Sequence, residues 1–107
     1  DILELAANVE ALDGPDREVD LSIMRYVCNI GGPSSNALRY TASLDAAMTL
    51  VPEGRQLSME TYDHNGIYPA HVRASAWVQG AERCFAANLA LALVAAALRA
   101  KEATNGQ

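Results

Sequence analysis

Two apolar stripes at helical spacing open the chain, with a break between them. The stripes comprise Ile2, Leu5, Ala6, Val9 and Leu12, and then Val19, Ile23, Val27 and Ile30. Apolar residues three or four positions apart lie on one face of a helix. Gly14-Pro15 interrupts the pattern, and Pro15 suits the first position of a helix because its missing N–H has no partner there. The pattern therefore predicts a helical hairpin with a short corner.

A third helix is predicted over residues 44–51, after a short extended stretch from Tyr40 to Ser43. The Ser43 hydroxyl suits the position before the helix, where it accepts a backbone N–H. Pro52 disfavours helical geometry in the residue before it. We therefore expect the helix to end at Val51.

Alternation of apolar and polar residues between Leu57 and Val78 predicts an antiparallel hairpin. Asn65-Gly66 is a strong turn signal, because both positions of a two-residue hairpin turn need a positive φ. A turn there pairs His64 with Ile67, Glu60 with His71 and Ser58 with Arg73 on one face, and Met59 with Val72 and Leu57 with Ala74 on the other. One face of the sheet is then apolar and the other mostly polar.

A last helix is predicted over Leu89 to Leu98, where every residue is Ala, Leu or Val. Asn88 suits its cap, residues 103–107 are expected to form a frayed tail, and residues 82–86 are a candidate third strand. A helix that is apolar all round is buried on more than one side. We expect it to pack under the sheet and also against another helix or a partner subunit.

These elements predict an α+β fold, in which a small antiparallel sheet of two to three strands packs with about four α-helices. The chain has 107 residues, of which 50% are hydrophobic and 20% are charged. This composition is globular, and the length suits one domain. We therefore expect a single domain over residues 1–107.

The charge and cysteine content limit the kinds of partner and the cellular location that we expect. The net charge of −5 and the scattered Lys and Arg residues argue against a nucleic-acid partner. The apolar run from Cys84 to Leu98 is shorter than the ~20 residues of a membrane-spanning helix. No signal peptide is recognised near Asp1, and two cysteines are too few for a secreted disulfide scaffold. We therefore expect a cytoplasmic protein without a membrane partner.

Three stretches of the sequence, in this order, resemble a known family: residues 14–20 (GPDREVD), 40–54 (YTASLDAAMTLVPEG) and 90–100 (ALALVAAALRA). The sequence is similar in these places to the phage α-β-α (ABA) sandwich domain family of small bacteriophage and prophage proteins. The resemblance implies helices on both sides of a small sheet and implies no particular activity. Members often carry Thr-Pro before the last helix, where this chain has Asn88-Leu89. The hairpin pattern, however, leaves one sheet face polar. That face is then either exposed to solvent or covered only in part by a helix, which leaves a groove.

A metal site near the hairpin is not expected. Glu60, Asp63, His64 and His71 supply suitable ligand types. The predicted pairing separates the two histidines by roughly 10–14 Å along the strands, too far for one ion. We interpret this group as a solvated turn and an exposed pair between Glu60 and His71.

The polar sheet face is the candidate binding site, formed by Glu60, His71, Arg73 and Trp77. Trp and Arg often dominate the binding energy of protein interfaces. The alternative is that a helix or loop of the same chain covers Trp77, so that it is not available to a partner. Cys28 and Cys84 lie in apolar surroundings outside any C-x-x-C pattern and are interpreted as structural. The sequence has no phosphate-binding loop, dinucleotide fingerprint or nucleophile elbow, and we expect no cofactor.

We therefore expect a small phage or prophage accessory protein, located in the host cytoplasm, that binds a protein partner and is not an enzyme. The partner can be a second copy that packs on the Ala-rich last helix. The alternative is a small-ligand binder or enzyme that uses a groove over His71, Arg73 and Trp77. A deep pocket that converges on His71 and Arg73 would favour this alternative.

Overall fold

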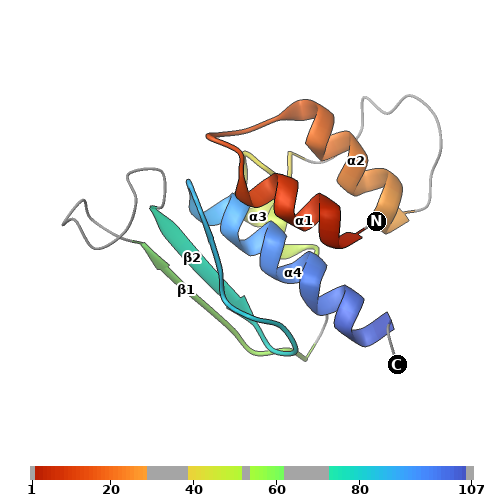
Figure 1. The fold of residues 1–107 in the computed structure, drawn as a ribbon, viewed down its shortest axis with the longest axis vertical. Helices are drawn as coiled ribbons and strands as arrows, with labels where there is room; N and C mark the ends of the chain where they lie inside the picture. Colours follow the sequence, from red (N-terminus) through yellow and green to blue (C-terminus); the bar gives the residue numbers. More distant parts are fainter. Residues whose placement is uncertain (1, 29–38, 52–53, 62–72, 106–107) are drawn as a thin grey trace.

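The computed structural model describes residues 2–28, 39–51, 54–61 and 73–105, and these residues form an α+β fold (Figure 1). In chain order the elements are α1 (Ile2–Glu10), α2 (Arg17–Cys28), α3 (Leu44–Met48), β1 (Leu57–Thr61), β2 (Ala74–Val78), β3 (Cys84–Ala86) and α4 (Leu89–Asn105). The predicted fold class is confirmed. The structure has a small antiparallel sheet packed with helices.

The predicted helical hairpin is present, with its second helix starting later than expected. Helix α1 buries Ile2, Ala6 and Val9 on one face, as the first apolar stripe predicts. Helix α2 begins at Arg17 and not at Pro15. Oδ1 of Asp16 accepts hydrogen bonds from the backbone N–H groups of Glu18 (2.9 Å) and Val19 (3.2 Å). The Asp16 carboxylate thus caps α2, and Pro15 lies in the corner that precedes it.

The stretch predicted to be extended, from Tyr40 to Ser43, forms a turn. The N–H groups of Ala42 and Ser43 both donate to the Arg39 carbonyl, at 3.0 and 2.9 Å. Ser43 then caps α3, as predicted, because its hydroxyl accepts the Ala46 N–H at 3.3 Å. The helix ends at Met48, three residues before the Val51 end that Pro52 suggested, and a turn follows.

The hairpin pairing is shifted by four residues from the predicted register. Leu57 pairs with Val78, Ser58 with Trp77, Met59 with Ala76, Glu60 with Ser75, and Thr61 with Ala74. The predicted pairs of Glu60 with His71 and Ser58 with Arg73 are therefore wrong. An even shift leaves every side chain on its predicted face, so the alternation of the sequence does not distinguish the two registers. The turn predicted at Asn65-Gly66 lies outside the described residues.

The candidate third strand is confirmed as β3, which is shorter than the predicted 82–86. It pairs antiparallel with β2, with Ala86 opposite Ala74 and Cys84 opposite Ala76. The strand order is β1-β2-β3. Strand β2 is therefore central among the described strands, and its Ala74, Ala76 and Val78 are buried.

Helix α4 is the centre of the core. Asn88 caps it, with Oδ1 accepting the Leu91 N–H at 2.8 Å. The helix packs on all three strands and also on α1 and α3, so that Leu91 to Leu98 are fully buried within one chain. Burial on more than one side is thus confirmed, and Leu91 to Leu98 offer no exposed surface to a second copy. The helix continues to Asn105, so residues 103–105 are helical and not a frayed tail.

The helices that touch the sheet lie on one side of it. Helix α4 contacts every strand, α1 contacts β3, and α2 and α3 stack on α1 and α4 without reaching the strands. Figure 1 shows the sheet as an outer layer with these helices behind one face. The family resemblance implies helices on both faces of the sheet. In the described part of the chain, helices lie on one face only. None of the helices described is long and apolar enough to span a membrane.

Candidate functional site

The sheet face turned away from α4 gathers the polar and aromatic side chains of the strands. We define it as the outer face, and its residues are Ser58, Glu60, Ser75, Trp77, Arg83 and Phe85. The alternation of side chains in each strand places them there. Met59, Ala76 and Cys84 occupy the alternate positions on the α4 side.

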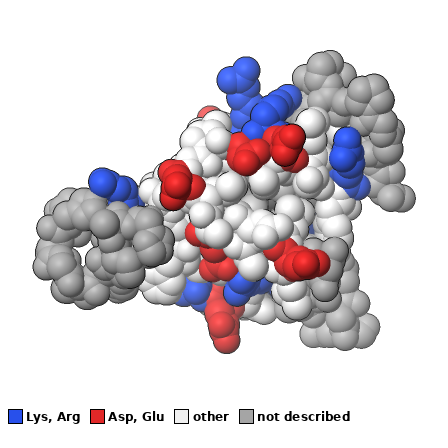
Figure 2. Space-filling view, turned by 45° about the horizontal axis from the view of Figure 1, so that its top comes forward, with Lys and Arg blue, Asp and Glu red and all other residues white. Residues whose placement is uncertain are grey.

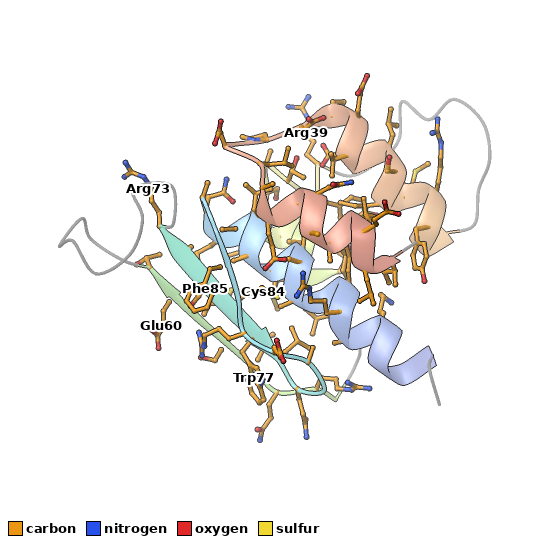
Figure 3. All side chains as sticks on the ribbon, in the orientation of Figure 1. Arg39, Glu60, Arg73, Trp77, Cys84 and Phe85 are labelled. Atoms are coloured by element: carbon orange, nitrogen blue, oxygen red, sulfur yellow. The ribbon has the colours of Figure 1, made fainter. Side chains whose placement is uncertain are left out.

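Strand pairing sets the neighbours on the outer face. Ser58 lies beside Trp77, and Ser75 lies between Glu60 on β1 and Phe85 on β3. Arg83 precedes β3 by one residue and shares the side of Phe85. The aromatic rings of Trp77 and Phe85 are half-buried, and Glu60 is exposed. Figure 3 shows Trp77 and Glu60 projecting from the sheet away from the helices.

Arg83 lies across the sheet and joins its strands. Its Nη1 donates to Oγ of Ser75 at 2.8 Å, and its Nη2 donates to Oγ of Ser58 at 3.0 Å. The side chain thus reaches from the start of β3 over β2 to β1. No carboxylate among the described residues lies within ion-pair distance of it. Two of its five N–H donors are used in these bonds, which leaves three for a ligand.

Of the four predicted site residues, the structure brings two onto this surface close to Arg83: Glu60 and Trp77. Arg73 is exposed immediately before β2, and four residues separate it from Trp77, roughly 13 Å along a strand. Figure 3 shows the two side chains at opposite ends of β2. His71, with the Asp63 and His64 of the discarded metal site, lies outside the described residues. Within the described ranges no cluster of three metal-ligating side chains occurs.

Two pockets formed by described residues lie on the helical side of the molecule. One, of about 500 Å³, opens between α1 and α2 and is lined by residues that include Leu5, Arg25 and Tyr26. The other, of about 400 Å³, lies at the start of α2 beside Arg39. Neither is lined by Arg73 or Trp77, so neither provides the groove that the enzyme or small-ligand alternative requires.

The floor of the second pocket is a buried structural contact. Asp20 is 2% exposed, and its Oδ1 accepts hydrogen bonds from both the N–H and the hydroxyl of Thr41, each at 2.8 Å. The Thr41 hydroxyl oxygen also accepts the Asp16 N–H at 2.8 Å. These bonds fasten the turn before α3 to the start of α2. Because the buried polar groups satisfy each other, the contact is suited to stability and not to ligand binding.

Cys84 faces the core, between β3 and α4, and has the properties of a structural cysteine. Burial, followed by the nearby Glu10 carboxylate, raises the pKa of its thiol to about 11. Glu10 also forms an ion pair with Arg99, which ties α1 to α4. A thiol that keeps its proton at neutral pH is a poor nucleophile and a poor metal ligand. The side chain of Cys28, the other predicted structural cysteine, is outside the described part of the chain.

Charges of both signs are interspersed over the face shown in Figure 2, and no large patch of a single sign appears there. The described residues of this face therefore lack the concentrated basic surface that nucleic-acid binding requires.

Sequence reasoning missed Arg83 and Phe85 as members of the site. The signal that could have found them is the alternation in residues 82–86. With Cys84 placed toward the core, Arg83 and Phe85 must face outward, beside Ser58 and Ser75, which the hairpin pattern already placed on the polar face.

No protein-family model, no curated protein and no solved structure matches this chain.

Proposed function

We propose that this protein acts by binding another protein chain through the outer face of its sheet, and not by catalysis. The observation that carries the proposal is the grouping of Trp77, Phe85 and Arg83 on a sheet face that no described helix covers. Trp and Arg are the residues most enriched among those that dominate binding energy, and interfaces are enriched in aromatic residues generally.

The anchoring of Arg83 favours binding. Its guanidinium is held by Ser58 and Ser75 before any partner arrives, so less side-chain entropy is lost when a partner forms further hydrogen bonds with it. The pairs across β1, β2 and β3 hold Trp77 and Phe85 on regular strands. A surface fixed in this way suits recognition of a shaped partner.

A phage or prophage setting is the biological context that we propose. Its support is the resemblance of residues 14–20, 40–54 and 90–100 to the phage ABA sandwich domain family. A protein of this kind, working in the host cytoplasm, would act as an accessory factor through its partner.

Site-specific photocrosslinking tests the proposal. A photoreactive phenylalanine analogue is placed at Phe85 and, as a matched control, at Tyr26, an exposed aromatic position on α2. In cells that express the protein, we expect crosslinked protein adducts from position 85 and few from position 26. Equal adducts at both positions, or none at position 85 while position 26 reacts, would contradict binding at the outer face.

A further inference from the structure

Within the part of the chain that the structure describes, the outer face carries one charge of each sign without an ion-pair partner. Among the described residues, neither Arg83 nor Glu60 lies within 4.0 Å of an opposite charge, although both border Ser75. We propose that the partner of this face is a second copy of the chain. Arg83 of each copy then pairs with Glu60 of the other. This inference rests on the proposed function and names its partner.

Two-fold symmetry makes both pairs form at once. When two identical faces meet, the symmetry axis lies in the plane between them. An axis that passes midway between the Arg83 guanidinium and the Glu60 carboxylate, at right angles to the line that joins them, brings each group opposite its counterpart. The result is a compact cluster of four charges with alternating sign, and the three remaining N–H donors of each Arg83 are available for it.

The charge pattern favours a second copy over an acidic or a basic partner. A purely acidic surface would satisfy Arg83 but repel Glu60. A purely basic surface would satisfy Glu60 and repel Arg83. The outer face itself carries both signs at matching separation, so self-pairing satisfies both groups. Leu91 to Leu98 of α4 offer no competing surface, because they are fully buried within the chain.

The size of the face indicates a weak dimer. Three strands, two of them five residues long, cover roughly 14 Å by about 17 Å. Stable interfaces bury about 800 Å² on each partner, and this patch is smaller. We therefore expect association that depends on protein concentration and weakens with salt, because the four charges are only partly shielded from solvent.

Trp77 provides a built-in probe of the proposed interface. It is the single Trp of the chain, so fluorescence excited selectively at tryptophan reports on the outer face alone. The ring is half-buried in one copy, and contact with a second copy would bury it further. On concentration of the protein we expect its emission to shift to shorter wavelength, in step with dimer formation in sedimentation velocity experiments.

Charge exchange tests the pairing. Arg83→Glu and Glu60→Arg each place like charges opposite one another, and each is expected to weaken the dimer at least about tenfold. The double variant restores opposite charges and should recover the wild-type constant within a few-fold. The control is Arg25→Glu, an exposed position on α2 with the same change in net charge as Arg83→Glu. It should leave the dimer unchanged.

Three results would overturn the inference. The first is a wild-type protein that stays monomeric, with constant Trp77 emission, up to millimolar concentration. The second is a dimer that both single exchanges leave intact, and the third is a double variant no better than the single ones. If Arg83→Glu does not fold, Glu60→Arg and its recovery on mixing with Arg83→Ala provide the same test, because the Glu60 side chain is exposed and forms none of the described ion pairs. A monomer whose position 85 still crosslinks to another protein would leave the proposed function standing.

Discussion

The two faces of the sheet differ in how much of each is covered by the described helices of the chain. The inner face packs on α4, and the alanines, leucines and valine from Leu91 to Leu98 are fully buried there between the strands, α1 and α3. The outer face carries Trp77, Phe85, Arg83 and Glu60 and meets no described helix. The inner face therefore contributes most to stability, whereas the outer face is the surface that we propose binds a partner. Substitutions on the two faces should separate these two properties.

The largest effect is expected in α4. Leu93 is 0% exposed, and Leu93→Ala should lower the free energy of unfolding by about 3 kcal/mol, because it removes buried apolar surface and leaves a cavity. Leu3→Ala is the matched control, since Leu3 on α1 is 49% exposed; a change below about 0.5 kcal/mol is expected there. Urea unfolding measures both. Similar losses for the two variants would mean that α4 is not the centre of the core.

The buried contact between Asp20 and Thr41 should come next. Asp20→Ala removes the acceptor of the Thr41 N–H and hydroxyl. The hydroxyl can still donate to the Asp16 carbonyl, which lies at 3.2 Å, but the buried Thr41 N–H is left unpaired, which should cost about 2 kcal/mol. Asp13→Ala, at an exposed carboxylate, should change the unfolding free energy by less than about 0.5 kcal/mol. An Asp20→Ala variant as stable as the wild type would show that this contact does not hold the turn on α2.

Alkaline pH should weaken the inner face through Cys84. Its thiol has a pKa of about 11 in the folded protein, raised from 9.0 by burial and by Glu10. Well below pH 9 the thiol keeps its proton in both the folded and the unfolded protein, so the free energy of unfolding does not change through Cys84. Above pH 9 the unfolded thiol ionises first, so the folded state binds more protons and stability falls as the pH rises. The expected loss is roughly 2 kcal/mol by pH 11.

The comparison that isolates this effect is Cys84→Ala against the wild type in urea unfolding at pH 8 and pH 11. All other titrating groups are common to the two proteins, so the difference in pH dependence belongs to Cys84. Identical dependence in both proteins would show that the thiol is not held neutral by the core.

The smallest effect on stability is expected for Arg83, for which we propose a role in binding. Arg83→Ala should lower the unfolding free energy by less than about 1 kcal/mol, because its two serine partners are able to rearrange or meet water. The matched arginine on the inner side is Arg99, which pairs with Glu10. Arg99→Ala should cost about 1 to 2 kcal/mol, since Glu10 then lies half-buried without its partner. The reverse order in thermal or urea unfolding would contradict the division between the two faces.

The elements themselves were largely predictable because they depend on neighbours in the sequence. The stripe with Ile2, Ala6 and Val9, the caps Ser43 and Asn88, and the alternation along β2 all correspond to the structure. Each reflects a local rule: one face of a helix, one hydroxyl or amide beside a helix start, or one side of a pleated strand.

The candidate site was predictable only in part. Glu60 and Trp77 lie on the outer face as predicted, because an even shift of register preserves the face of each residue. The residues predicted to pair with β1 were wrong, because the observed register is shifted by four residues from the one that a turn at Asn65-Gly66 predicts. Arg73 is consequently separated from Trp77, and Arg83, which is distant in sequence from Ser58, joins the site.

The sequence by itself determined the helices, the strands and the two-sided character of the sheet, because spacing and capping act within a few residues. Only the tertiary structure decided the strand register, the burial of α4 within a single chain, and the placement of Arg83 across Ser75 and Ser58. These features depend on contacts between segments far apart in the chain, which the local rules of spacing and capping do not specify.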